Sequence, residues 1–165
     1  MKDTSRENLT DPSTHEENSI FQPDPEIINW RIHFRSPVHK VYNALANSNG
    51  RSRFWAESAD ETDGVIYFKV PGNLETAGRI LEQIPNKKFV TEYFGWTVSF
   101  HLEPAPNGTG TDLHMSCINF PKSDRTEIIA GWVSVLMAMK AAVDFNVDLR
   151  NHDPKRTWWE GYADN

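Results

Sequence analysis

The sequence predicts an α+β fold in which a curved sheet packs its apolar face against one long C-terminal helix. Residues Trp96 to Glu103 alternate apolar and polar side chains with a strict period of two, which is typical of a strand with one buried face. After Phe120 and Pro121 the apolar residues change to helical spacing. Because one helix must cover the whole apolar face of the sheet, a fold of this kind can enclose a cavity.

Length and composition indicate one domain with extra segments at its ends. The 165 residues are enough to bury roughly 70% of the surface that the unfolded chain would expose. The net charge of -6 argues against nucleic acid or an anionic membrane as the main partner. We expect no membrane span, because no stretch approaches the roughly 18–20 apolar residues that cross a bilayer. The N-terminus has no apolar run typical of a secretory signal, so we expect a cytoplasmic location.

The first elements follow from residues at the start of the chain. Residues 1–25 are acidic and contain few large apolar side chains, so we expect a disordered segment. Alternation predicts the first strand over Glu26–Arg35. Ser36 and Pro37 supply a capping hydroxyl and a first-turn proline, so a short helix is expected from there to Asn49-Gly50. Two weaker elements are expected next, a short helix or turn over Arg51–Trp55 and a strand over Ala56–Thr62.

The middle of the chain is predicted to be a series of strands joined by tight turns. Asp63-Gly64 is typical of a two-residue hairpin turn, and other turns contain proline, asparagine and glycine. Gly78 indicates a bulge or a bend within its strand. The strands expected here are Val65–Val70, Glu75–Ile84, Lys88–Phe94, Trp96–Glu103 and Asp112–Cys117.

The long helix is predicted over Asp124–Leu149, with Ser123 or Asp124 as its cap. Gly131 costs about 1 kcal/mol relative to alanine inside a helix. It therefore indicates a close approach of the sheet or a ligand, or a bend. The residues expected on the buried face are Ile128, Trp132, Val135, Leu136, Met139, Val143 and Val147.

Short motifs along the chain carry a resemblance to a known family. They are Ser36–Leu45, Phe54-Trp55, Gly78–Leu81, Trp96–Pro104, Gly108–Thr111 and Gly131-Trp132 followed by Leu136. Their order and spacing resemble the Bet v 1-like (START, SRPBCC) superfamily, and within it the activator of Hsp90 ATPase homologue-like (AHSA1-type) domain.

The resemblance implies a helix-grip fold, in which a seven-stranded antiparallel sheet wraps around the C-terminal helix and two short helices follow strand 1. It covers roughly residues 26–150, which we interpret as a helix-grip ligand-binding domain. Residues 1–25 and the aromatic tail at 151–165 lie outside it. The family implies no single activity, since its members include carriers and cyclases, so function must be argued from the site.

The residues expected to line a cavity follow from strand alternation and helical spacing. They are Trp30, Ile32, Phe34, Trp55, Phe68, Trp96, Phe100, Met115, Trp132, Leu136 and Met139. Aromatic and methionine side chains can hold a flat or flexible apolar ligand. They can equally fill the core, and the six tryptophans of the chain could leave only a small pocket. Both interpretations stay open at this point.

Arg79 is the candidate polar anchor, because a buried arginine can hold a ligand carboxylate through two parallel hydrogen bonds. The alternative for Arg79 is a solvated position or a cross-strand ion pair. The other polar residues that could converge on the cavity are Tyr67, Glu75, Tyr93 and Asn119. Cys117 occupies an inward strand position, so we expect a buried, unreactive thiol.

A pair of histidines is predicted on the outer face of the last hairpin. If Leu102 pairs with Leu113, His101 lies opposite His114, and His33 on the first strand could lie nearby. This spacing matches no recognised metal-ligand motif, so we predict no metal site. No catalytic or phosphate-binding signature is present, so neither catalytic residues nor a cofactor are expected.

The predicted function is a binding module for a small apolar or amphipathic molecule, acting as a carrier or sensor. One alternative is a protein-interaction module similar to an Hsp90 co-chaperone domain, which would use the outer surface, the acidic segment and the tail. A second is a cyclase- or hydrolase-like enzyme with an acid or base inside the cavity. A closed core with Trp158 and Trp159 exposed would favour the interaction module, and an enclosed polar pocket would favour the enzyme. We otherwise expect the tail aromatics to dock on the domain or on a partner chain.

Overall fold

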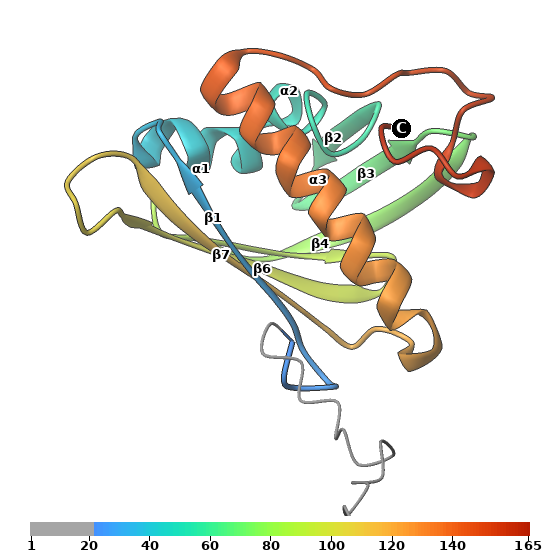
Figure 1. Ribbon diagram of the computed structural model, residues 1–165, viewed down its shortest axis with the longest axis horizontal. Helices are drawn as coiled ribbons and strands as arrows, with labels where there is room; N and C mark the ends of the chain where they lie inside the picture. The colour runs from blue at the N-terminus through green and yellow to red at the C-terminus, as the bar shows by residue number, and fades with distance from the viewer. Residues whose placement is uncertain (1–21) are drawn as a thin grey trace, which may run out of the picture.

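The fold is a seven-stranded antiparallel sheet with one long helix across its face (Figure 1). The structure is a computed structural model that describes residues 22–165, so most of the acidic segment 1–25 lies outside the described residues. The strands are β1 (Ile28–Phe34), β2 (Ser58–Thr62), β3 (Val65–Val70), β4 (Leu74–Ile84), β5 (Lys88–Tyr93), β6 (Trp96–Pro104) and β7 (Thr111–Ile118). The helices are α1 (Val38–Ala46), α2 (Ser48–Arg51) and α3 (Arg125–Phe145), with short 3-10 turns η2 (Lys122–Asp124) and η3 (Trp158–Glu160). The predicted helix-grip fold is confirmed.

The strands lie in the order β1-β7-β6-β5-β4-β3-β2. From β2 to β7 each strand pairs with the next one in sequence, so short turns suffice to connect them. β1 pairs with β7 at the far edge, with Phe34 opposite Thr111. The register of the β6–β7 hairpin is the predicted one, since Leu102 lies opposite Leu113.

The two short helices after β1 are present, but the second one lies earlier in the chain than the predicted Arg51–Trp55. α2 ends at Arg51, where the prediction had it begin. Ser36 does not cap α1. Its hydroxyl instead donates to the carbonyl of Val143 at 3.3 Å, and its backbone N–H donates to the carboxylate of Asp144 at 3.0 Å. The start of α1 is therefore tied to the end of α3, a tertiary contact that no local pattern could reveal.

α3 ends earlier than the predicted Leu149. Asn146 adopts a left-handed conformation with a φ of 58°, which asparagine tolerates and which terminates the helix. Val147 lies beyond this end and is exposed, so its predicted place on the buried helix face was wrong. The predicted side-chain cap was also wrong, because the Ser123 hydroxyl donates to Asp124 rather than to the helix backbone.

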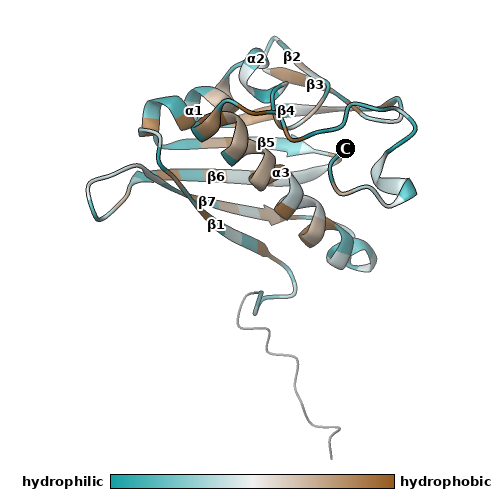
Figure 2. Ribbon diagram, turned by 45° about the horizontal axis from the view of Figure 1, so that its top comes forward, coloured by the Kyte–Doolittle hydropathy of each residue, from teal (hydrophilic) through white to brown (hydrophobic). Residues whose placement is uncertain are grey.

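The core lies between α3 and the sheet, as Figure 2 shows by the helix crossing over the strands. Trp132, Leu136 and Met139 of α3 are each no more than 3% exposed. They belong to the same cluster of buried residues as Phe100 and Met115 on the sheet. The predicted packing of the helix on the apolar face of the sheet is therefore confirmed.

The segment Lys122–Phe145 is long and apolar enough to cross a membrane, with a mean hydropathy of 1.6 over its most apolar stretch. The expectation that no stretch approaches this limit was therefore wrong. Of that stretch, 44% is buried inside the fold. A core helix passes the same test of length and composition, so this finding is weak evidence for a span.

Gly78 in β4 lies where the neighbouring strand comes very close. A Cβ atom at this position would lie 1.8 Å from the backbone oxygen of Glu92, so only glycine fits without a shift of the backbone. The irregularity of the β4–β5 ladder lies slightly further on, between Ile80 and Glu82. The glycine thus marks a close approach of two strands, and the bulge predicted there is displaced along β4.

Candidate functional site

The residues predicted to line a cavity all lie in or against the core. Trp30, Ile32 and Trp96 are partly buried, and the others are buried. Most of these side chains belong to one continuous cluster of packed residues, which fills much of the space between α3 and the middle of the sheet.

Trp55 lies at the centre of this packing. Its ring centroid is 5.1 Å from that of Phe68, 5.5 Å from that of Phe100 and 5.8 Å from that of Trp132. Aromatic pairs at such separations add about 0.5–1.5 kcal/mol beyond the burial of their area. Trp55 lies in the turn that follows α2, so the two short helices position it between the sheet and α3.

An apolar pocket of about 480 Å³ remains at one end of this core. It lies beside the first turns of α3, and the β3–β4 turn, the β5–β6 turn and the C-terminal tail form its other walls. The lining residues are Trp55, Val70, Pro71, Leu74, Tyr93, Phe94, Trp96, Asp124, Glu127, Ile128, Gly131, Trp132, Ser134, Val135, Trp158, Trp159 and Asn165. Of the predicted cavity residues, only Trp55, Trp96 and Trp132 line this aromatic pocket.

The aromatic pocket carries few polar groups. Glu127 accepts a hydrogen bond of 2.8 Å from the indole N–H of Trp158, and the Ser134 hydroxyl donates to the backbone oxygen of Ala163 at 2.5 Å. Burial strongly raises the pKa of Tyr93, so its phenol stays neutral. The predicted buried position of Cys117 is confirmed, and burial raises the pKa of its thiol to about 11, which favours the protonated form.

The C-terminal tail runs back along α3 after the helix ends and reaches the aromatic pocket (Figure 1). Arg150 fixes its start by donating to the backbone oxygens of Ala56 at 2.8 Å and Ser52 at 2.7 Å. Thr157 is buried at the β3–β4 turn, 3.4 Å from where a Cβ of Gly72 would lie. The adjacent tryptophans predicted that the tail docks on the domain or on a partner chain, and Trp158 does dock on the domain. Sequence reasoning did not identify the tail as a wall of the site.

His152 is a second attachment point of the tail. Its ring nitrogens lie 2.9 Å from Glu57 and 3.0 Å from Asp148. Hydrogen bonding to Glu57, supported by Asp148, raises the pKa of His152. Burial by itself would raise the pKa of Asp148, but hydrogen bonds from Arg150 and His152 outweigh this effect and hold it below its ordinary value.

The contribution of His152 to stability should therefore disappear at alkaline pH. A histidine whose folded pKa is raised stabilises the fold fully below its unfolded pKa of about 6.5 and loses this contribution as pH rises through the folded value. We expect the stability difference between wild type and His152→Gln, measured by urea unfolding, to be largest below the unfolded pKa of about 6.5 and to shrink as pH rises through the higher folded pKa. A difference that stays constant over this range would contradict the ion pairs.

The candidate polar anchor, Arg79, does not line the aromatic pocket. Its side chain is 72% exposed and lies 3.4 Å from the carboxylate of Glu92, which corresponds to the alternative of a cross-strand ion pair. Of the other polar candidates, Tyr93 lines the pocket, whereas Tyr67, Glu75 and Asn119 are exposed and do not.

The histidine pair is present as predicted, with His101 opposite His114. His114 lies 3.5 Å from Glu103, and His33 lies 2.7 Å from Asp112, its partner on β7. Within residues 22–165, no group of three or more histidine, cysteine or acidic side chains is arranged to hold a metal ion.

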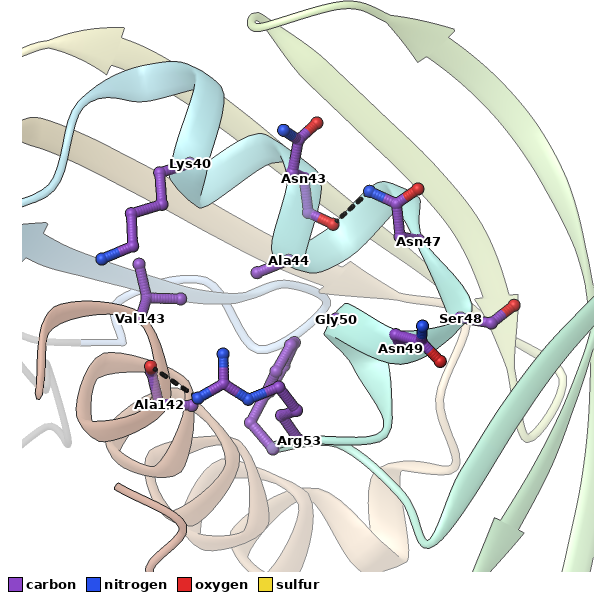
Figure 3. A pocket seen from close by; sticks show the side chains of 11 residues that line it. Lys40, Asn43, Ala44, Asn47, Ser48, Asn49, Gly50, Arg53, Ala142 and Val143 are labelled. Atoms are coloured by element: carbon purple, nitrogen blue, oxygen red, sulfur yellow. Dashed lines mark hydrogen bonds between the residues drawn. The ribbon is translucent and has the colours of Figure 1, made fainter. Parts of the chain in front are cut away.

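A second, more polar pocket of about 520 Å³ lies between α1, α2 and the C-terminal end of α3 (Figure 3). Its prominent side chains are Lys40, Asn43, Asn47, Asn49 and Arg53. Arg53 already donates to the carbonyl of Ala142 at 3.3 Å and to Asn146 at 2.6 Å. It therefore acts as a cap for the end of α3, and the aromatic pocket is the better candidate for an apolar ligand.

The fold and the position of the aromatic pocket between sheet and helix define a helix-grip module of the Bet v 1-like class. The chain belongs to the family described as Activator of Hsp90 ATPase homolog 1-like protein, which matches residues 35–144. The match ends near the end of α3, so the tail that covers the pocket lies outside it. No curated protein sequence matches the chain.

Solved structures with the same fold come from several bacteria. A Staphylococcus saprophyticus protein is 18% identical, with a TM-score of 0.65 over 75% of this chain and 96% of its own. The Aha1 dimer from Colwellia psychrerythraea is 22% identical, with a TM-score of 0.64 over 72% and 96% of the two chains. CalU16 from Micromonospora echinospora is 25% identical, with a TM-score of 0.57 over 70% and 72%. The first two likenesses establish the fold alone.

Proposed function

We propose that this domain binds a small apolar or amphipathic molecule in the aromatic pocket, as a carrier or sensor. The observation that carries the proposal is the pocket itself. Its 480 Å³ falls within the range of about 300–1,000 Å³ that is usual for small-molecule sites, and its walls are mainly aromatic and aliphatic. Family membership fits either a small-molecule-binding or a protein-binding module, and the pocket supports the first.

Gly131 offers a direct test of the proposal. It lines the pocket from within α3, and a Cβ added there would meet no atom within 4 Å. Gly131→Ala should therefore add up to about 1 kcal/mol of stability through helix propensity and leave most of the pocket open. Gly131→Leu should fold equally well but fill the space beside Trp132.

The test combines native mass spectrometry with binding measurements. Wild type and Gly131→Ala are expected to co-purify with a small apolar ligand, and Gly131→Leu to lose it. Ligand retained by Gly131→Leu at wild-type occupancy would place binding elsewhere. Absence of any ligand from wild type, together with no binding of added naphthalene derivatives in calorimetry, would overturn the proposal.

A second candidate function is protein interaction through the outer side of α3 and the tail. Trp159 is 70% exposed, and Met137 and Val133 of α3 are 51% and 40% exposed. These side chains offer apolar contact area, and the Colwellia psychrerythraea protein is described as a dimer. Self-association would appear as a concentration-dependent mass in light scattering that Met137→Glu abolishes; a constant monomer mass would exclude it.

A further inference from the structure

The aromatic pocket has a marked charge bias. Asp124 and Glu127, in η2 and the first turn of α3, both line it. Among the residues that the structure describes, no lysine, arginine or histidine lines it. The remaining lining residues are uncharged side chains, so every charged side chain of this pocket is negative.

The basic residues closest in sequence to these two carboxylates are engaged elsewhere. Lys122 pairs with Glu26. The Arg125 guanidinium donates to the backbone oxygens of Gln22 at 3.3 Å and Asp24 at 3.1 Å. Within residues 22–165, neither pocket carboxylate forms an ion pair.

The hydrogen bonds of the two carboxylates leave room for a ligand. Asp124 accepts from the Ser123 hydroxyl at 2.7 Å through one of its oxygens. Glu127 accepts from the indole of Trp158 through one of its oxygens as well. Within residues 22–165, the second oxygen of each carboxylate accepts no hydrogen bond. The N-terminus of α3 opposes these charges with only about half a positive charge, so the two carboxylates dominate the local potential.

The aromatic walls also favour a positively charged ligand. The ring faces of tryptophan and tyrosine carry negative electrostatic potential and attract cations within about 6 Å. Trp96, Trp158 and Trp159 line the pocket together with Tyr93. An organic cation would therefore interact favourably with both the rings and the carboxylates, whereas an anion would be repelled by both.

We propose that the ligand of this pocket is an organic cation, an amine or quaternary ammonium group attached to an apolar, preferably flat body. This inference rests on the proposed function, since it assigns the chemical class of the ligand that the pocket would hold. The apolar body would lie against Trp132 and Val135, and the cationic group would lie near Asp124 and Glu127.

Three probes that share one aromatic body can test the charge preference. Naphthylmethyltrimethylammonium, naphthylmethanol and naphthoate differ mainly in charge. In isothermal titration calorimetry at low ionic strength, we expect the cation to bind at least about tenfold more tightly than the anion, with the alcohol between them. Because charge interactions at a pocket rim are screened, this ratio should shrink when the salt is raised to about 0.5 M.

The double variant Asp124→Asn/Glu127→Gln should bring the three affinities to within a few-fold of one another. Both changes keep the shape of the side chain, and glutamine can still accept the hydrogen bond from Trp158. Glu103→Gln, which removes one negative charge from an exposed position at the far end of β6, should leave the preference unchanged.

The outcomes separate the two proposals. Equal binding of all three probes by wild type, or tighter binding of the anion, would overturn the cation preference and leave the binding function intact. A preference that persists undiminished in the double variant would overturn the role assigned to Asp124 and Glu127, because the carboxylates would not be its source. Failure of all three probes to bind would contradict the binding function itself.

Discussion

Trp132→Ala should destabilise the fold by about 3–5 kcal/mol, the range for loss of a large aromatic side chain from a packed core. Trp132 is 3% exposed, and its ring lies 5.8 Å from Trp55, 5.9 Å from Tyr93 and 6.0 Å from Phe100, measured between centroids. The truncation would leave a cavity where α3, the sheet and the segment after α2 meet. Urea unfolding followed by circular dichroism measures the loss.

Trp159→Ala provides the matched control. Trp159 is 70% exposed, so its removal should change stability by no more than about 0.5 kcal/mol. Trp132→Phe should fall between the two, because it keeps an aromatic ring of smaller size in the same place. A loss below about 1 kcal/mol for Trp132→Ala would mean that the helix does not pack on the sheet through this residue.

The sheet could be predicted closely because alternation is a local signal that tertiary contacts rarely override. The β6–β7 pairing shows this best. Two inward leucines, Leu102 and Leu113, fixed the register, since a slip of one residue would turn every apolar side chain of a strand to the wrong face. Helical spacing, another local signal, placed Trp132 and Met139 on the buried side of α3.

The pocket could not be located from these patterns, because its walls other than α3 come mostly from turns and the tail, which have no periodicity. Trp158 and Trp159 reach it through a tail whose path depends on the hydrogen bonds from Arg150 to distant backbone oxygens. An acidic residue in the first turn of a helix is favourable in itself, so Glu127 needs no ligand to explain its place in the sequence. That Glu127 also lines the pocket follows from the docking of the tail beside it.

The buried arginine of this fold could not be predicted from local sequence patterns. The sequence analysis proposed Arg79 as the polar anchor, but Arg79 is exposed and pairs with Glu92. Among the arginines of residues 22–165, the one that the fold buries completely is Arg51, at the end of α2. It lies in a four-residue helix with no amphipathic pattern, so no sequence signal indicated its burial.

Arg51 joins three elements through its guanidinium group. It donates to the carbonyl of Leu45 in α1 at 2.9 Å and to the carbonyl of Ala59 in β2 at 3.1 Å. The carboxylate of Glu61 lies 3.4 Å away. Burial lowers the pKa of Arg51, and Glu61 acts in the opposite direction. These contacts hold the two short helices against the edge strand and so position Trp55 in the core.

Arg51→Ala should therefore cost about 3–5 kcal/mol of unfolding free energy, because it leaves buried carbonyl groups without donors and a cavity in place of the side chain. Arg51→Lys should recover part of this loss, since one ammonium group keeps the charge but cannot reproduce the planar set of donors. The matched control is Arg79→Ala, whose side chain is 72% exposed, with an expected change of at most about 1 kcal/mol. Urea unfolding of the variants gives the comparison, and near-UV circular dichroism of Arg51→Lys reports whether Trp55 keeps its environment. Equal losses for Arg51→Ala and Arg79→Ala would show that the buried guanidinium does not hold the helices in place.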